Sequence, residues 1–371
     1  MVSLKRKIVL AVGGTGGHLF PAQALARQMR DRNIPIQVLF MGANLSCSRY
    51  FSAREFPAID IESATPYGSL LNLMSAGKRL IKGTWQSIRQ LKKERPLAVI
   101  GFGSFHSFPV LLAAVACRIP IVLFESNAIP GKVNRFFSRW ADWTAVQFED
   151  TKKFMKGKTV LAEMPLWDKD RIATSLREDA ARYFNLSSDI KTILVFGGSQ
   201  GARSINRLFC QAMQQWEGRP AVQVIHLTGD ITSCQEALLC YRRLGIPAQV
   251  KVFEDRMPLA WRMADLAVCR SGAGTTAELI AHQIPSILIP YPHAAENHQL
   301  YNAKILAETI GGGVVIEEKS LSDCLGKELK LILDANGKKL QEMKQSIVTF
   351  RQTTERDELC SLIERMIEDI C

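Results

Sequence analysis

Two segments of the chain share one pattern, an apolar strand that ends in a glycine-rich turn and leads into a helix. The first reads KIVLAVGGTGGHLFPA from Lys7, and the second reads KTILVFGGSQGARSIN from Lys191. A turn of this kind presents backbone N–H groups at a helix N-terminus, where anions such as phosphates bind. Because the pattern occurs once in each half, we predict two nucleotide-type α/β domains, each of which opens with its own strand and turn.

The rest of the chain fits the same fold class. Short apolar runs alternate with helical patterns, which is typical of doubly wound parallel sheets. These runs cover residues 8–12, 37–41, 98–101, 121–124 and 144–146 in the first half, and 192–196, 222–227, 250–253, 266–269 and 286–289 in the second. We predict an N-terminal domain of residues 1–164, a C-terminal domain of residues 165–345, and a helical tail of residues 346–371 that packs back on the N-terminal domain.

Composition narrows the class of protein. The chain has 371 residues, of which 47% are hydrophobic and 22% are charged, as in globular proteins. No apolar run is long enough for a spanning helix, and residues 8–12 are too few for the core of a signal peptide. The nine cysteines form no CxxC pair, which favours reduced thiols in a cytoplasm. The net charge of +11 suits an anionic partner, although a basic protein without such a partner would share it.

The glycine turns do not fit the common nucleotide motifs. In the first turn, Leu19 stands where a dinucleotide fingerprint requires its third glycine, and the ribose-binding acid expected about 20 residues later is absent. Neither turn continues into the Gly-Lys-Ser/Thr of a P-loop. The sequence therefore argues against a dinucleotide oxidoreductase and against a P-loop enzyme.

A second cluster of polar residues lies at 268–306, where Arg270 and the small residues Ser271–Thr276 precede a helix. The freed amides and hydroxyls suit a diphosphate, and Glu278, one turn later, could accept both hydroxyls of a ribose. An ordinary capping turn followed by a first-turn acid would have the same residues. Glu296–Gln299 would suit hydrogen bonds to sugar hydroxyls.

Six segments together resemble one family, the bacterial UDP-N-acetylglucosamine:lipid I N-acetylglucosaminyltransferases of peptidoglycan synthesis. They are GGTGGHLFPA at 13, GFGSFHSFP at 101, FESNAIPGKVNR at 124, FGGSQGARSIN at 196, CRSGAGTTAEL at 269 and ENHQLYNA at 296. The resemblance implies the GT-B fold, in which two Rossmann-like domains face each other across a cleft. It implies transfer of N-acetylglucosamine, with inversion, from UDP-N-acetylglucosamine to the C4 hydroxyl of lipid I, with no cofactor and no metal bound to the donor.

The resemblance also implies the roles of individual residues. In the C-terminal half, Glu278 binds the ribose, the segment 253–254 meets the uracil, and His298 and Gln299 read the sugar. In full, the implied donor-binding residues are Ser199, Gln200, Phe253, Glu254, Arg270, Ser271, Gly272, Ala273, Gly274, Thr275, Glu278, His298 and Gln299. The implied acceptor-binding residues of the N-terminal half are Thr15, Gly16, Gly17, His18, Phe105 and Asn127.

The catalytic base has two candidates. His18 is the first, because an unperturbed imidazole titrates near neutral pH, although a lone histidine is often structural. Glu125 is the second, if burial raises its pKa. The Asp-x-Asp at Asp168 and Asp170 matches metal-dependent transferases, but it falls in the predicted linker and is attributed to chance.

Three positions depart from the family pattern. Trp167 stands where the family usually has an arginine near the donor, Phe105 replaces a tyrosine, and Ser126 replaces a glutamine. The missing arginine leaves diphosphate binding to backbone amides and Arg270.

A lipid-linked acceptor requires contact with a membrane. Residues 67–96 combine leucines with seven basic residues and a single acid, and RFFSRW at 135–140 extends the pattern. We expect this surface to dock on anionic lipid at the cytoplasmic face of the plasma membrane as a peripheral protein. A core-packed helix with a solvated basic face is the alternative. Cell-wall synthesis proteins are further expected partners.

Two rival functions stay open. Another GT-B transferase with a different lipid or small acceptor would share the donor half. A nucleic-acid-binding protein would explain the charge and would bind DNA or RNA in a salt-sensitive way, but it would not explain the two glycine turns. We therefore expect no nucleic-acid partner.

Overall fold

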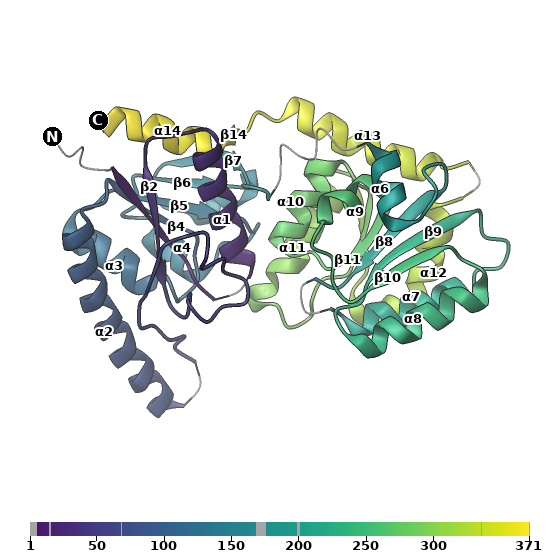
Figure 1. Cartoon of the computed structure of the whole chain (residues 1–371), viewed down its shortest axis with the longest axis horizontal. Coiled ribbons are helices and arrows are strands. Elements are labelled where there is room, and N and C mark those ends of the chain that lie inside the picture. The colour runs from purple at the N-terminus through teal and green to yellow at the C-terminus, as the bar shows by residue number, and fades with distance from the viewer. Residues whose placement is uncertain are drawn as a thin grey trace. The chain divides into compact units, whose positions relative to one another are not determined.

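The structure is a computed structural model that describes residues 6–14, 16–67, 69–167, 176–198, 201–334 and 336–370. The chain divides into two compact units (Figure 1). Unit 1 comprises Met1–Trp167 and Arg356–Cys371, and unit 2 comprises Asp168–Glu355.

Unit 1 is built on an eight-stranded sheet in the order β14-β7-β6-β5-β4-β1-β2-β3, and all of its strand pairs are parallel. The strands are β1 (Lys7–Ala11), β2 (Gln37–Gly42), β3 (Ala58–Asp60), β4 (Ala98–Gly101), β5 (Ile121–Glu125), β6 (Trp143–Val146), β7 (Thr159–Glu163) and β14 (Asp357–Glu358). All five strand runs predicted in the first half are present. The sequence analysis does not predict the short strands β3, β7 and β14, because runs of two to five residues carry little periodicity.

Most helices of unit 1 connect successive strands, and α14 follows the last strand. They are α1 (Gly16–Asp31), α2 (Leu70–Glu94), α3 (Phe108–Cys117), α4 (Lys132–Phe137), the 3-10 helix η1 (Glu149–Phe154) and α14 (Leu359–Ile370). The helix α2 projects well beyond the end of the sheet (Figure 1). The C-terminal segment belongs to this unit, and Arg32, the residue after α1, donates to Ser361 (2.9 Å) and pairs with Glu358.

Unit 2 is built on a six-stranded parallel sheet in the order β10-β9-β8-β11-β12-β13. The strands are β8 (Lys191–Phe196), β9 (Val222–Leu227), β10 (Ala248–Lys251), β11 (Ala264–Cys269), β12 (Ser286–Leu288) and β13 (Gly313–Val315). The helical segments are α6 (Arg177–Phe184), α7 (Arg203–Gln214), α8 (Ile231–Leu244), α9 (Met257–Met263), α10 (Ala273–His282), η2 (Ala295–Asn297), α11 (His298–Lys304), η3 (Ile305–Thr309), η4 (Glu318–Ser320), α12 (Leu321–Ile332) and α13 (Lys338–Thr353).

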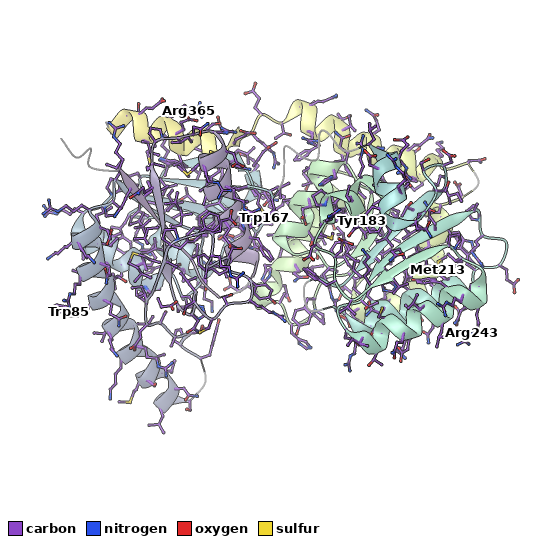
Figure 2. The ribbon with its side chains drawn as sticks, viewed as in Figure 1. Trp85, Trp167, Tyr183, Met213, Arg243 and Arg365 are labelled. Carbon is purple, nitrogen blue, oxygen red and sulfur yellow. The ribbon has the colours of Figure 1, made fainter. Side chains whose placement is uncertain are left out.

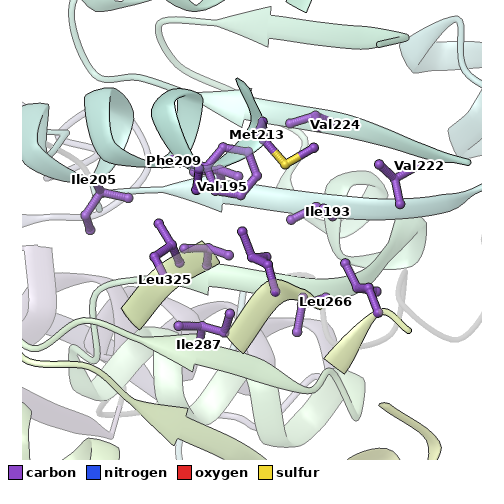
Figure 3. Close-up of a cluster of buried hydrophobic side chains, with 14 of the residues drawn as sticks. Ile193, Val195, Ile205, Phe209, Met213, Val222, Val224, Leu266, Ile287 and Leu325 are labelled. Carbon is purple, nitrogen blue, oxygen red and sulfur yellow. The ribbon is translucent and has the colours of Figure 1, made fainter. Parts of the chain in front are cut away.

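The core of unit 2 lies between the sheet and the helices α7, α8 and α12. Figure 3 shows Phe209 and Met213 of α7 beside Val195 and Val224 of the adjacent strands, while Leu325 of α12 belongs to the same cluster. These side chains stand at alternate strand positions and at helical spacing. The sequence pattern therefore sets which face of each element is buried.

Both glycine turns lie where the strand order reverses. The strand β1 has β4 on one side and β2 on the other, and β8 likewise separates β11 from β9. Ligands of open parallel sheets bind beyond the carboxyl ends of the strands at such a point. The two turns therefore occupy the expected ligand-binding position of each unit.

Candidate active site

The first glycine turn follows β1 and leads into α1. Gly14 has a φ of +85°, which L side chains rarely adopt, so glycine is required there. Gly16 and Gly17 begin the helix, and Gly17 is exposed. Their amides are among the first of α1 and lack partners within the helix, as in an anion site. Thr15, expected at the acceptor, lies outside the described residues.

His18 stands in the first turn of α1, with its ring directed at β4. Its Nδ1 lies 2.8 Å from the carbonyl oxygen of Phe102, the residue that follows β4. A carbonyl oxygen only accepts, so Nδ1 carries the proton and the basic lone pair lies on Nε2. This tautomer suits a general base.

His106 accompanies His18 at the same turn. Burial lowers the pKa of His106, and the nearby His18 lowers it further. A Cβ added at Gly14 would lie 3.1 Å from His106 Nδ1, so the ring packs directly on the glycine turn. We infer that His106 is neutral near pH 7.

Glu125, the other candidate base, ends β5 and is 3% exposed. Its Oε1 accepts from the backbone N (2.9 Å) and Nδ2 (3.2 Å) of Asn127, and its Oε2 accepts from Gly131 N (3.0 Å) and Asn134 Nδ2 (3.0 Å). With four donors around it, the carboxylate organises the loop that follows β5. Asn127, expected at the acceptor, is one of these donors.

Asn134 is a residue that the sequence analysis passed over, although it lies within a quoted motif. Its Nδ2 also donates to Phe124 O (2.9 Å). A Cβ at Gly103 would lie 3.2 Å from this nitrogen and 3.4 Å from His18 Cε1. Asn134 therefore links the Glu125 loop to the surroundings of His18, a contact that only the folded sheet creates.

Phe105 lies beside the entrance to α2. Its ring is edge-on to Tyr67 at 6.3 Å between centroids, and Ser63 Oγ donates to its carbonyl oxygen (2.7 Å). Lys132 Nζ lies 5.9 Å from the Tyr67 ring. These contacts connect the segment GFGSFHSFP at 101 to the residues that precede α2.

The second glycine turn follows β8. At Gly201, which has a φ of +73°, a Cβ would lie 2.3 Å from Thr228 O, so only glycine fits. Ser199 and Gln200, expected at the diphosphate, lie outside the described residues.

A network of buried hydrogen bonds supports this turn. Asn206 Nδ2 donates to Thr228 O (2.9 Å), and Asn206 Oδ1 accepts from His226 Nε2 (3.1 Å). Tyr241 OH lies 2.8 Å from His226 Nδ1. Burial lowers the pKa of His226 to about 3, so the ring is neutral and Nδ1 accepts. No periodic pattern in the sequence indicates this arrangement, because its members come from α7, β9 and α8.

The N-terminus of α10 is open. Gly272 is the N-cap residue, and no side chain caps the first amides, which belong to Ala273, Gly274 and Thr275. Ser271 Oγ donates instead to Gln299 O (2.8 Å). A Cβ at Gly272 would meet no atom within 4 Å. This geometry favours an anion site over the ordinary capping turn.

Glu278 lies in α10 beside the indole of Trp261. Burial raises the pKa of Glu278 to about 7, and the indole partly offsets this rise. Trp261 is held by stacking on His282 and by an edge contact with Phe196. The carboxyl group is therefore kept in a poorly solvated position in the second turn of α10.

Arg270, which is expected at the diphosphate, contacts the loop after β12 and the 3-10 helix η4. It is 9% exposed, and its guanidinium donates to Ile289 O (3.2 Å) and Pro290 O (3.1 Å) and pairs with Glu318 (2.7 Å). The guanidinium thus joins the loop after β12 to Glu318 of η4. We infer that Arg270 positions this loop.

The loop after β12 leads into α11. Glu296 and Asn297 both adopt left-handed conformations, with φ of 51° and 54°, which is costly for residues other than glycine and is common at functional sites. Gln299 Oε1 accepts from Tyr291 N (3.0 Å), and His298 Nδ1 lies 2.7 Å from Ala295 O. Both side chains expected at the sugar are therefore held in place by this loop.

Phe253 and Glu254 follow β10. Phe253 is 61% exposed and can stack on a planar ligand. Burial alone would raise the pKa of Glu254, but Lys251 (2.6 Å), the amide of Arg256 (2.7 Å) and Tyr183 (3.0 Å) hold it below its ordinary value. Glu254 therefore shapes the loop from inside, while Phe253 faces solvent.

Within the described ranges, no group of three or more His, Cys, Asp or Glu residues could hold a metal ion. Asp168 and Asp170 lie outside these ranges. Across the same part of the chain, no helix has the length and apolar content needed to span a bilayer.

The chain is similar to known glycosyltransferases along nearly its whole length. It matches the glycosyltransferase family 28 N-terminal domain over residues 8–146 and the C-terminal domain of that family over residues 192–357. The UDP-N-acetylglucosamine--N-acetylmuramyl-(pentapeptide) pyrophosphoryl-undecaprenol N-acetylglucosamine transferase of Protochlamydia amoebophila is 39% identical, over 97% of this chain and 96% of that protein. The protein of the same name from Halothermothrix orenii is 36% identical, over 96% and 98%.

A solved structure gives the same result at the level of fold. The crystal structure of Acinetobacter baumannii MurG superposes with a TM-score of 0.77 at 24% identity and covers 98% of this chain and 99% of that one. The predicted α/β fold with two parallel sheets is thereby confirmed as the GT-B type. The chain belongs to glycosyltransferase family 28, among the UDP-N-acetylglucosamine--N-acetylmuramyl-(pentapeptide) pyrophosphoryl-undecaprenol N-acetylglucosamine transferases.

Proposed function

We propose that this protein transfers N-acetylglucosamine from UDP-N-acetylglucosamine to the C4 hydroxyl of the N-acetylmuramyl residue of lipid I, which makes lipid II. The names of the full-length relatives support the two substrates. One observation supports the chemistry most directly: the hydrogen bond between His18 Nδ1 and Phe102 O leaves the basic lone pair on Nε2. His18 stands beside a glycine turn that suits a diphosphate.

We propose that the donor binds to unit 2, the C-terminal domain. The open N-terminus of α10 supplies amides to the diphosphate, Glu278 accepts the ribose hydroxyls, and the exposed ring of Phe253 stacks on the uracil. Developing negative charge on the leaving UDP is stabilised by the same amides and by the dipole of α10. Arg270 contributes indirectly, since it holds the loop that carries His298 and Gln299.

We propose that the acceptor binds to unit 1, the N-terminal domain, with its diphosphate at the first amides of α1. His18 Nε2 takes the proton of the attacking hydroxyl as the oxygen bonds to the anomeric carbon. The bond from this carbon to the diphosphate oxygen breaks on the opposite side, and its electron pair leaves with UDP. A single displacement of this kind inverts the anomeric configuration.

Glu125 is the weaker candidate for the base. Its two oxygens already accept from four donors, so a proton could reach it only at the expense of the loop. We propose that Glu125 and Asn134 position the acceptor loop around His18.

The proposed transfer can be tested with labelled donor. We expect label from UDP-N-acetylglucosamine to appear in the lipid fraction only when lipid I is supplied, and a chelator to leave the rate unchanged. Transfer to a different glycolipid, with lipid I inert, would instead favour the rival GT-B function.

We also propose that α2 and the end of α4 dock unit 1 on an anionic membrane at the cytoplasmic face. Leu71 and Trp85 are 78% and 73% exposed, and Figure 2 shows Trp85 on the outer side of α2. The exposed apolar side chains of this surface are Tyr67, Leu71, Leu73, Met74, Ile81, Trp85, Phe136 and Trp140. Exposure of this kind argues against the core-packed alternative.

Contacts through α3 join the two parts of this docking surface. The Cβ of Pro109 lies 3.2 Å from the position of a Cβ at Gly83 of α2, while Phe108 stacks on Phe136 at 5.9 Å. Basic residues surround the apolar ones on α2, among them the exposed Lys78 and Arg79. The surface thus combines apolar anchors with positive charge, as interfacial helices do.

Reversing the charge of Lys78 and Arg79 should weaken binding to anionic vesicles. Each basic residue near such a membrane contributes about 1 kcal/mol, so Lys78→Glu/Arg79→Glu is expected to lower the partition coefficient at least about 30-fold in sedimentation. Lys82 is left unchanged because it pairs with Glu62. The control Lys327→Glu/Lys330→Glu on α12 makes the same charge change and should bind like the wild type. Equal binding by both variants would rule out this docking surface.

A further inference from the structure

A pocket in unit 1 lies next to the first glycine turn, and the mechanism above leaves it without a role. It encloses about 220 Å³. Its lining consists of Gly14, Ala43, Asn44, Cys47, Ser48, Arg49, Tyr50 and His106. Gly14 and His106 place the pocket beside His18, since Gly14 belongs to the same turn and His18 affects the pKa of His106 electrostatically.

The segment after β2 forms the outer wall of this pocket and is firmly held. The backbone N of Leu45 donates to Asp60 Oδ1 (2.5 Å) at the end of β3. Gln23 of α1 donates to Tyr50 O (2.8 Å) and accepts from Ser52 N (2.8 Å). Because both ends of the wall are anchored on regular elements, the pocket exists before any ligand binds.

The pocket is polar, with one strong positive charge. The Arg49 guanidinium lies 4.8 Å from the centroid of the Tyr50 ring and donates to its hydroxyl (2.6 Å). None of the ion pairs found between described residues includes Arg49, and the pocket lining contains no acid. His106 Nδ1 is buried with no hydrogen-bond partner in the described part of the chain. A ligand with an anionic group would pair with Arg49, and further hydrogen-bonding atoms would match the polar lining.

We propose that this pocket binds the peptide-bearing part of the acceptor, and that Arg49 pairs with a carboxylate of that peptide. This inference rests on the proposed function, which supplies an acceptor that carries a pentapeptide and a diphosphate. The lining favours the peptide. Asn44 and Ser48 both donate and accept hydrogen bonds, as peptide amides require, whereas a diphosphate only accepts.

Two acceptor substrates distinguish binding of the peptide carboxylate from binding of the diphosphate. One carries the N-acetylmuramyl-pentapeptide on a diphosphate with a short lipid, and the other lacks the peptide. We expect Arg49→Ala to raise KM for the peptide acceptor at least about 10-fold, with KM for UDP-N-acetylglucosamine and kcat changed less than about twofold. For the peptide-free acceptor, Arg49→Ala and the wild type should be equal.

The matched control is Arg54→Ala, an exposed arginine nearby that does not line the pocket. It should leave both KM values unchanged. An equal rise in KM for both acceptors would assign Arg49 to the diphosphate and overturn the proposal. An unchanged KM for the peptide acceptor would overturn it as well.

Cys47 offers a measurement that does not depend on turnover. It is exposed and lines the pocket, so a bound peptide should shield its thiol from alkylation, which peptide mapping detects at this residue. We expect the pentapeptide acceptor to slow alkylation of Cys47 in the wild type and not in Arg49→Ala, while UDP and the peptide-free acceptor leave the rate unchanged. Protection without sugar transfer would refute the proposed function and support the pocket. Sugar transfer without protection of Cys47 would support the proposed function and refute the proposed role of the pocket.

Discussion

Replacing His18 with alanine is expected to lower kcat about 10²–10⁴-fold and to leave KM for UDP-N-acetylglucosamine nearly unchanged. The base acts on the acceptor hydroxyl, whereas the proposed donor site is built from residues of unit 2. The hydrogen bond from Nδ1 to Phe102 O fixes the reactive tautomer, and alanine removes the Nε2 lone pair that accepts the proton. Steady-state kinetics with both substrates varied measures the two parameters separately.

Glu125→Gln serves as the comparison for this prediction. The amide keeps one oxygen as an acceptor for the loop donors but cannot act as a base. We expect its main effect on KM for the acceptor, because the loop around Asn127 and Asn134 loosens. A large loss of kcat in Glu125→Gln together with near-normal turnover in His18→Ala would move the base to Glu125.

Glu278→Gln is expected to change ligand affinity and stability in opposite directions. A carboxylate that accepts two ribose hydroxyls is worth about 1.5–3 kcal/mol, so we expect UDP to bind about 10–150-fold more weakly to the variant in calorimetry. Glu254→Gln is not a suitable comparison, because that carboxylate supports its own loop. The control variant is Glu296→Gln, at an exposed residue of the loop before α11. It shows how the loss of one negative charge by itself changes the affinity for UDP.

The stability effect follows from the raised pKa. Burial raises the pKa of Glu278 from its ordinary value of 4.5 to about 7, so the folded state favours the protonated form. The stability that protonated Glu278 contributes to the folded state is therefore fully present below about pH 4.5. It is lost as the pH rises through 7. Glutamine avoids this loss, and Glu278→Gln without ligand should raise the free energy of unfolding by about 1–3 kcal/mol at pH 8 but little at pH 4.5. Denaturant titrations at the two pH values measure the difference, and an equal gain at both would contradict the account.

The fold was largely predictable because its signals are local. Apolar runs such as 8–12 and 192–196 followed by glycines require a strand and a turn, and both turns lie where the strand order reverses. The short strand β14 had no such signal. It forms only because Asp357 and Glu358 pair with the edge strand β7.

The site was predictable only in part, because most of its contacts join distant elements. Arg270 stands among small residues that suit a phosphate, and nothing in that stretch indicates that Glu318 and two carbonyl groups hold its charge. The Ala43–Tyr50 wall carries no motif, and its pocket exists only because β2 lies beside β1. The sequence therefore identifies residue types for the chemistry, while tertiary packing decides which of them are free to act.

Trp167 illustrates the same limit. At this position the family pattern has an arginine near the donor. In the structure its ring lies 3.6 Å from the guanidinium carbon of Arg27, which also donates to both oxygens of Glu55. Gln28 of the same helix donates to Leu166 O (3.4 Å). Trp167 therefore anchors the end of the first segment of unit 1 onto α1, and a stacked aromatic ring does so without a charge.

The central claim is transfer between two named substrates, and the structure of the product tests it most directly. Purified protein incubated with lipid I and UDP-N-acetylglucosamine should give one new glycoside, and nuclear magnetic resonance should place it as a β linkage on the muramyl C4 oxygen with one UDP released per linkage. An α linkage, a different linkage position, or release of UDP without a new glycoside would contradict the account.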